Sequence, residues 1–288
     1  MSSSAAASGR QENVRLDPVK CKDGSRPNVL LAEDSPAARV LTGALLSHIG
    51  CDVDVAEHGE EALTYIRNYD YDLVLMDIEM PVMDGVVAAK TIRTMGGTAA
   101  ATPIVALSAF LADTKRSSFW QQHFDVALSK PAGKHQLHAT ISQVLDFNPA
   151  QSKWLNDSKD IEESLPEEVV ELVENYKLER ILSSIAYEDQ IALLKTASAS
   201  MSRYSGDLAF RQDCAIEDDV IHILENLRGL SATFAASRLF HLTSGLSADI
   251  LDKAGAGFNR QVGDICDCAN QTAEILKQKY QTLPEGEV

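Results

Sequence analysis

Acidic side chains follow two apolar, strand-length runs of the sequence at the points where each run ends. Glu33 and Asp34 follow N-V-L-L-A at 28–32, and Asp77 follows D-L-V-L-M at 72–76. The carboxyl ends of parallel strands at a topological switch point share one crevice, so we expect the three carboxylates to converge. Negative charges that close disfavour ionisation unless a cation joins them, and oxygen-only ligands suit Mg²⁺. The sequence therefore predicts a magnesium site.

A hydroxyl and an ammonium group follow two later runs. Ser108 comes after P-I-V-A-L at 103–107, and Lys130 and Pro131 come after V-A-L-S at 126–129. At the same sheet edge, Asp77 could attack a phosphoryl group in line while the metal, Ser108 and Lys130 take up the charge of its oxygens. This arrangement predicts phosphoryl transfer to a carboxylate. A group of ordinary, solvated charges at strand ends is the structural alternative.

Five strand-length runs must position these residues, and they lie at 28–32, 51–56, 72–76, 103–107 and 126–129. Helix-period segments separate the runs. The alternation predicts an α/β fold, a doubly wound five-stranded parallel sheet with helices on both faces. Before it, residues 1–26 are rich in Ser, Ala and charged residues and lack periodicity, which predicts a flexible N-terminal tail.

The strand signal stops after the fifth run. A polar, proline-flanked stretch predicts a linker at 149–164. Apolar residues with helical spacing then predict helices at 167–185, 188–213, 216–231, 234–253 and 258–281. Residues 165–283 are therefore expected to form an all-α helical bundle, most simply an antiparallel one.

Composition excludes several classes of partner. The chain has 288 residues and a formal net charge of −16, with no clustered run of Lys and Arg that could neutralise nucleic-acid phosphates. Its five scattered cysteines suit a reducing cytosol better than a disulfide framework. The first residues resemble no signal peptide, and no apolar run of about 18 residues occurs. We expect a cytoplasmic protein that binds neither nucleic acid nor a membrane.

Residues 27–148 resemble the receiver domain of two-component response regulators, which has a flavodoxin-like fold. The similarity rests on L-L-A-E-D-S, L-M-D-I-E-M-P-V-M-D-G, A-L-S-A and L-S-K-P. The resemblance implies that Asp77 is phosphorylated. It also implies that Mg²⁺ is held by Glu33 or Asp34, by Asp77 and by the backbone carbonyl of Glu79.

The same resemblance implies roles for residues at the later strand ends. Ser108 would be the switch hydroxyl, Lys130 would pair with the phosphoryl group, and a cis peptide bond would precede Pro131. Pro81 and Gly85 match a loop that lets a partner approach, although both are also ordinary turn residues. The chain has no ATP-binding kinase motif, so we expect a phosphoacceptor and not an enzyme, with a sensor histidine kinase or a histidine phosphotransfer (HPt) protein as phosphodonor.

Two departures bear on these expectations. Ala127 stands where the family usually has an aromatic residue that turns inward, so we expect signal output to depend less on the face built from the fourth helix and fifth strand. Phe124 is an alternative aromatic for that role. A haloacid-dehalogenase-like phosphatase also uses an Asp nucleophile, but its second Asp, two residues later, is replaced here by Glu79, and the acidic pair precedes Asp77.

Residues 165–283 resemble, more distantly, an HPt domain. Such domains expose a histidine in mid-helix, with leucine two, lysine three and glycine four residues later. Within H-I-L-E-N-L-R-G-L-S at 222–231, the pattern fits when Glu225 takes the position of the histidine. The register that starts at His222 has an acid and an amide in place of lysine and glycine. The region therefore resembles a degenerate HPt-like domain.

Arg228 and Gly229 lie one helical turn from Glu225 on the same face, where a cation can meet a phosphoryl group and a glycine leaves room for a receiver. Glutamate is a poor nucleophile beside imidazole. We therefore expect a docking face made of Glu225, Arg228 and Gly229, with His222 beside it, that binds its own receiver, another receiver or a kinase without accepting phosphate. Active phosphotransfer through His222 and plain helix packing both remain alternatives.

Overall fold

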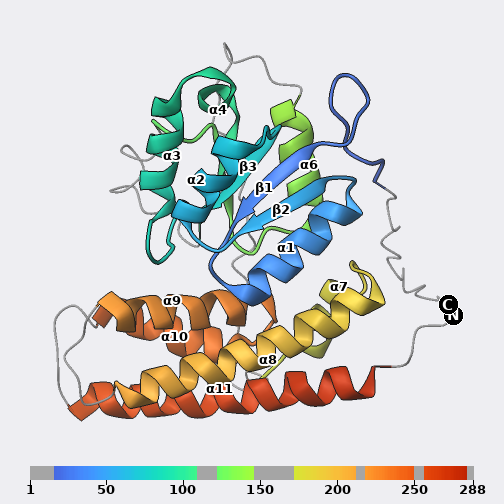
Figure 1. Cartoon of the computed structure of the whole chain (residues 1–288). Helices are drawn as coiled ribbons and strands as arrows, with labels where there is room; N and C mark the ends of the chain where they lie inside the picture. Colours follow the sequence, from blue (N-terminus) through green and yellow to red (C-terminus); the bar gives the residue numbers. More distant parts are fainter. Residues whose placement is uncertain (1–15, 109–121, 146–171, 212–217, 250–255, 284–288) are drawn as a thin grey trace, which may run out of the picture.

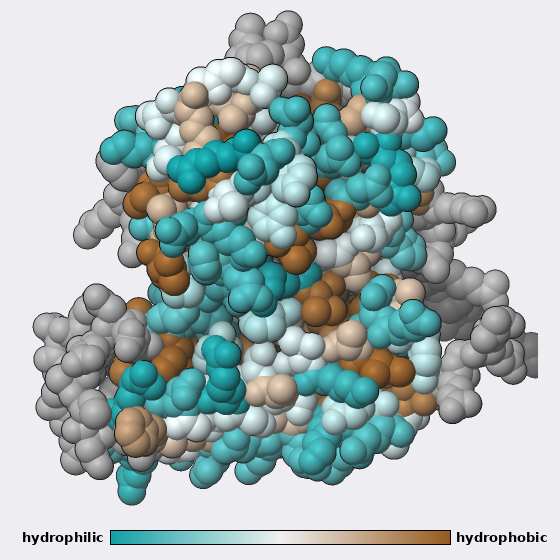
Figure 2. Space-filling model, viewed as in Figure 1, coloured by the Kyte–Doolittle hydropathy of each residue, from teal (hydrophilic) through white to brown (hydrophobic). Residues whose placement is uncertain are grey.

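The structure is a computed structural model, and it describes residues 16–108, 122–145, 172–211, 218–249 and 256–283 (Figure 1). Residues 16–145 form an α/β half and residues 172–283 form a helical half, and the two lie against each other. Figure 2 shows mostly polar side chains over both halves, with apolar side chains where they meet. The predicted linker at 149–164 lies outside the described residues.

The α/β half contains one sheet of five strands: β1 (Asn28–Ala32), β2 (Asp52–Ala56), β3 (Leu73–Asp77), β4 (Ile104–Ser108) and β5 (Val126–Ser129). All neighbouring strands are parallel, and their order is β2-β1-β3-β4-β5. The predicted doubly wound parallel sheet is confirmed. The chain runs outward from β1 to β2 and then returns to β3 on the other side of β1. The topological switch point therefore lies between the carboxyl ends of β1 and β3.

Helices cover both faces of the sheet. One face carries α1 (Pro36–His48) and α6 (Lys134–Leu145), and the other carries α2 (Gly59–Asn68), α3 (Gly85–Met95) and α4 (Gly97–Ala101). Leu31 and Leu75 pack on the side of α1 and α6, whereas Leu30 and Met76 pack on the side of α2 and α3. Burial of both faces explains why the central strands β1 and β3 are continuous apolar runs.

The segment at 16–26, predicted as part of a flexible tail, lies against the α/β half. Val19 is buried, and its N–H donates to the carbonyl of Ile49 at 2.8 Å. Nε2 of His138 in α6 lies 2.8 Å from the carbonyl oxygen of Asp17. The prediction is wrong here because a single buried valine produces no periodic signal. The rest of the predicted tail lies outside the described residues.

The helical half contains α7 (Asn175–Leu182), α8 (Tyr187–Phe210), α9 (Asp218–Thr233), α10 (Ser237–Asp249) and α11 (Ala256–Thr282). The last four lie within a few residues of the predicted ranges. The first is shorter than the expected 167–185, and the described residues before Asn175 are not helical. α8 packs along α11 and α9, and α10 packs against α9 and α11. Within the described ranges, no helix combines the length and apolar character needed to cross a bilayer.

α1 joins the two halves because it packs against α8 and α9 as well as against the sheet. Leu41 of α1 belongs to the same apolar cluster as Leu193 and Met201 of α8. No residue of α1 before Ser47 is exposed. A helix that is apolar all round is a buried helix, and Arg39 is the only Lys, Arg, Asp or Glu in α1.

Candidate functional site

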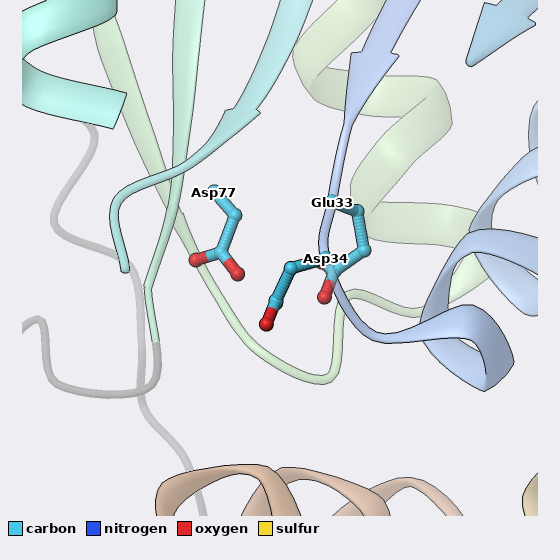
Figure 3. Close-up of side chains that lie close together, drawn as sticks. All are labelled: Glu33, Asp34 and Asp77. Carbon is cyan, nitrogen blue, oxygen red and sulfur yellow. The ribbon is translucent and has the colours of Figure 1, made fainter. Parts of the chain in front are cut away.

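The acid cluster, defined as Glu33, Asp34 and Asp77, lies at the carboxyl ends of β1 and β3. Ligand oxygens from the three side chains all lie within 4.8 Å of one another. Figure 3 shows the side chains directed into the same space. Glu33 and Asp77 are 1% and 6% exposed. The structure therefore brings together the three acids that the strand order was expected to bring together.

Lys130, which follows β5, supplies positive charge to the acid cluster. Its Nζ lies 2.5 Å from Oε2 of Glu33 and 2.6 Å from Oδ2 of Asp77. The peptide bond between Lys130 and Pro131 is cis, as the resemblance implied. Burial by itself lowers the pKa of Lys130, but the charges of Asp77 and Glu33 outweigh it and hold this pKa above its usual value. The ammonium group therefore stays protonated.

One ammonium does not neutralise three carboxylates. Burial raises the pKa of Asp77 well above its usual value, and the charges of Glu33 and Asp34 raise it further against the opposing effect of Lys130. Burial likewise raises the pKa of Glu33. A hard divalent cation with oxygen ligands fits this donor set, and Mg²⁺ is such a cation. The backbone of Glu79 lies beside these carboxylates, because its N–H donates to Oδ1 of Asp77 at 3.2 Å.

Ser108 ends β4 and lines the same cleft as the acid cluster and Lys130. Its carbonyl accepts a hydrogen bond from the N–H of Lys130 at 2.8 Å, so the ends of β4 and β5 hold the two residues next to each other. A hydroxyl, an ammonium and three carboxylates therefore border one space. This is the arrangement that the order of residues in the sequence predicted.

Ala127 lies in β5, half-buried against the apolar core on the α2 and α3 side of the sheet. Phe124, the alternative aromatic, is 4% exposed and belongs to that same core. A methyl group at 127 cannot swing between an inward and an outward position. The reduced role of this face in signal output stays a prediction.

Gly85 lies directly behind Asp77. A Cβ built on Gly85 would lie 1.9 Å from the carbonyl oxygen of Asp77. α3 begins at Gly85, and the side chain of its N-cap, Asp84, accepts a hydrogen bond from the N–H of Val87 at 2.8 Å. Glycine is therefore required so that α3 can start this close to the end of β3. Pro81, in the preceding loop, is exposed, and its role in partner approach stays a prediction.

Arg39 is a site residue that the sequence reasoning missed. Its Nη1 donates to the carbonyl oxygens of Glu33 and Asp34, both at 2.8 Å. Its Nη2 pairs with Oε1 of Glu57 at 2.8 Å. The guanidinium of α1 therefore ties down the backbone that carries both acids. Side-chain patterns give no signal for such a role, because the acceptors are main-chain carbonyls.

Replacing Arg39 with alanine is expected to weaken Mg²⁺ binding to the acid cluster about 10-fold, the scale seen when residues that orient metal ligands are removed. The loop between β1 and α1 would lose its two backbone contacts. Arg39→Lys should recover only part of the affinity, because an ammonium lacks the planar fork of donors. Isothermal titration calorimetry with Mg²⁺ measures the effect, with Arg67→Ala on the exposed surface of α2 as control. Unchanged affinity in Arg39→Ala would contradict this role.

α9 forms a wall of the cleft that contains the acid cluster. The lining of the cleft joins the acid cluster, Ser108 and Lys130 to His222, Glu225, Asn226 and Gly229 of α9. In Figure 3 a helix of the helical half passes below the three acids. The face that the sequence predicted for docking therefore lies against the α/β half of its own chain.

His222 makes a direct contact across this cleft, because its Nε2 lies 3.2 Å from Oδ2 of Asp34. The hydrogen bond to Asp34 raises the pKa of His222; burial opposes the rise, and the charges of Asp34 and Glu225 add to it. The sequence places Glu225 at the centre of the docking face and His222 beside it. The structure places both in the cleft wall and gives His222 the contact to an acid.

Arg228 was expected to bring a positive charge to the docking face, and Gly229 was expected to leave room for a receiver; the structure treats the two differently. Burial lowers the pKa of Arg228, while the charges of Glu225 and of Glu79 in the α/β half oppose that change. Arg228 is therefore close enough to Glu79 to sense its charge across the junction. A Cβ built on Gly229 would meet no atom within 4 Å. Close approach does not require a glycine at 229 in this arrangement.

Comparison with known proteins assigns the α/β half. Residues 29–142 match the family model of the response regulator receiver domain. The two-component response regulator ORR41 of Oryza sativa is 42% identical over 119 residues, which are 40% of this chain and 91% of that protein. Sensor protein GacS of Pseudomonas syringae is 37% identical over 130 residues, which are 44% of this chain and 14% of that protein.

Further relatives are longer than the shared region. Transcription factor SKN7 of Candida albicans is 35% identical over 130 residues, which are 45% of this chain but 22% of that protein. The receiver domain of a sensor histidine kinase from Pseudomonas aeruginosa, solved with a magnesium ion in its active site cleft, is 28% identical with a TM-score of 0.41, covering 43% of this chain and 100% of that one. Through residues 29–142, the chain belongs to the response regulator receiver domain family.

Proposed function

We propose that this chain is a signalling protein of a two-component phosphorelay, in which Asp77 accepts a phosphoryl group in the presence of Mg²⁺. One observation carries the proposal. The carboxylate of Asp77 lies within 2.6 Å of the ammonium of Lys130 and beside Glu33 and Asp34, at the topological switch point of a receiver-type sheet. These are the groups that attack at phosphorus and balance the charge of its oxygens.

The residues of the cleft would divide the chemistry among them. Glu33, Asp34, Asp77 and the backbone carbonyl of Glu79 would hold Mg²⁺, which when bound neutralises charge on the phosphoryl oxygens. A carboxylate oxygen of Asp77 forms the new P–O bond as the bond between phosphorus and the donor breaks. Lys130 exchanges its contact with Asp77 for one with a phosphoryl oxygen, and the hydroxyl of Ser108 donates to another.

The phosphodonor in this proposal is a sensor histidine kinase or an HPt protein. The donor presents a phosphorylated imidazole, and Asp77 receives the phosphoryl group. The chain therefore acts as a phosphoacceptor whose only catalysis concerns its own phosphorylation and dephosphorylation. Its net charge of −16 is consistent with output through protein contacts and without nucleic acid.

The helical half is proposed as a degenerate HPt-like bundle that docks to a receiver or kinase and does not accept phosphate. Glu225, Arg228 and Gly229 form its docking face. The position of α9 in the wall of the cleft supports this role, since it lies where an HPt helix would meet a receiver. The chain's own receiver is the first partner of that face.

A second candidate is phosphotransfer between Asp77 and His222. The imidazole of His222 lies in the same cleft as Asp77 and contacts Asp34. Imidazole is a better phosphoryl acceptor than the carboxylate of Glu225. In this alternative the helical half would be an active relay step.

A small-molecule phosphodonor with Mg²⁺ tests both candidates on the full chain. Intact mass should increase by one phosphoryl group in the wild type and stay unchanged in Asp77→Asn, because the amide cannot form the acyl phosphate. Asp70→Asn, at an exposed position between α2 and β3, should behave as the wild type. Site mapping should place the phosphate on Asp77 alone. Acid-labile phosphate on His222 would favour the relay candidate, and an unmodified wild type would contradict the proposed function.

A further inference from the structure

We propose that His222 and a divalent cation compete for the carboxylate of Asp34. Cation binding to the acid cluster and docking of α9 over the cleft would then oppose each other. This inference deepens the proposed function and rests on its cation site. It adds a regulatory role for the helical half that needs no phosphoryl group on it.

The contacts of the acid cluster differ from one acid to the next. The ammonium of Lys130 contacts Glu33 at 2.5 Å and Asp77 at 2.6 Å. Asp34 instead has the imidazole of His222 at 3.2 Å. The side chain of Asp34 is only 8% exposed, so water offers its carboxylate few alternative partners. The imidazole comes from the other half of the chain, and this contact exists only while α9 is docked.

α9 places the side chain of His222 in the wall of the cleft. Asn226 lies one helical turn after His222, and its Nδ2 donates to the backbone carbonyl oxygen of His222 at 3.0 Å. Leu227 is buried in the apolar cluster that α9 shares with α8, and Leu230 lines the cleft. α9 therefore carries His222 in the wall of the cleft, and the packing of α8 against both α1 and α9 keeps that helix near the cleft.

A cation and His222 use the same carboxylate. A cation coordinated by Asp34 uses the same carboxylate that His222 contacts at 3.2 Å and withdraws charge from its oxygens, so the contact with His222 is weakened. Loss of the contact between His222 and Asp34 removes a polar contact that holds α9 over the cleft. Cation binding should therefore loosen α9, and docked α9 must weaken cation binding by the same factor.

The opposite coupling is also physically possible and makes the test decisive. A histidine that hydrogen-bonds a metal-ligating carboxylate can orient that ligand and strengthen metal binding. In that case removal of His222 would lower the affinity for Mg²⁺. Competition predicts that removal of His222 raises it.

The experiment is a calorimetric titration of the full chain with Mg²⁺ alone. His222→Ala should bind Mg²⁺ about 10-fold more tightly than the wild type, within the range of coupling between sites. His222→Gln, which keeps a hydrogen-bond donor at this position, should fall between them. His241→Ala is the matched control, because His241 is exposed on α10 and should leave the affinity unchanged.

Hydrogen exchange supplies a readout that does not depend on affinity. Mg²⁺ should speed exchange of backbone amides in α9 of the wild type and leave α11 unchanged. Equal or weaker Mg²⁺ binding by His222→Ala, or protection of α9 by Mg²⁺, would overturn the inference while leaving the cation site intact. If neither the wild type nor the variants bound Mg²⁺, the cation site of the proposed function would be wrong, and this inference with it.

Discussion

Lys130→Met is expected to destabilise the fold by about 3 kcal/mol, the scale for breaking a buried ion pair from one side. The ammonium lies between two carboxylates that are 2% and 8% exposed in their side chains, so its loss leaves Glu33 and Asp77 facing each other without a cation. Phosphorylation of Asp77 should also fall about 100-fold or more, as when one preorganised donor to a transition state is removed. Urea denaturation and the rate of phosphate incorporation measure the two effects.

Mg²⁺ separates the electrostatic cause from loss of packing. A cation that binds the native state adds to its stability, and in Lys130→Met it also relieves the uncompensated charge. Added Mg²⁺ should therefore stabilise the variant more than the wild type. Lys90→Met, at an exposed position of α3, controls for removal of a lysine as such. If Mg²⁺ stabilised Lys130→Met and the wild type equally, the lower stability of the variant would have a cause other than uncompensated charge.

Gly85→Ala is expected to be the most disruptive single-methyl change near the site. The new Cβ would lie 1.9 Å from the carbonyl oxygen of Asp77, which is backbone and cannot rotate away. Either α3 or the end of β3 must shift, at a cost at or above the upper end of about 1–3 kcal/mol for overpacking. The shift would also displace the carboxylate of Asp77. We expect a lower unfolding midpoint together with slower phosphorylation.

Gly43→Ala is the matched control because the same methyl group there meets nothing within 4 Å. Gly43 lies inside α1, where alanine is favoured over glycine by up to about 1 kcal/mol. This variant should be as stable as the wild type or more so. A Gly85→Ala protein with wild-type stability and phosphorylation would mean that α3 can move away from Asp77 without cost.

Much of the α/β half could be predicted because its signals are local. Apolar runs of strand length alternate with helical periodicity, and the residue after a strand must lie at the sheet edge. Convergence of Glu33, Asp34 and Asp77 follows from that rule and from the switch point. Local patterns also predicted α8 to α11 to within a few residues.

Contacts between distant segments could not be predicted in this way. The main-chain bonds of Arg39 leave no trace in side-chain spacing, and the burial of Val19 depends on a pocket formed by other segments. For α9, comparison with the HPt motif put Glu225, and not His222, at the centre of the predicted docking face. Which side chain meets Asp34 is decided by how α9 lies on the cleft, and that depends on packing between α8 and α1.

The enclosure of α1 changes which substitutions the chain can accept. In α2, residues such as Glu60, Thr64 and Arg67 face water and can vary with little cost. α1 has no such side before Ser47, since the sheet lies on one side and α8 on the other. Variation in α1 must satisfy two neighbours at once, so a change that suits the sheet can still disturb the helical half. The helix that carries Arg39 is therefore not free to diverge independently of the region fused to this receiver.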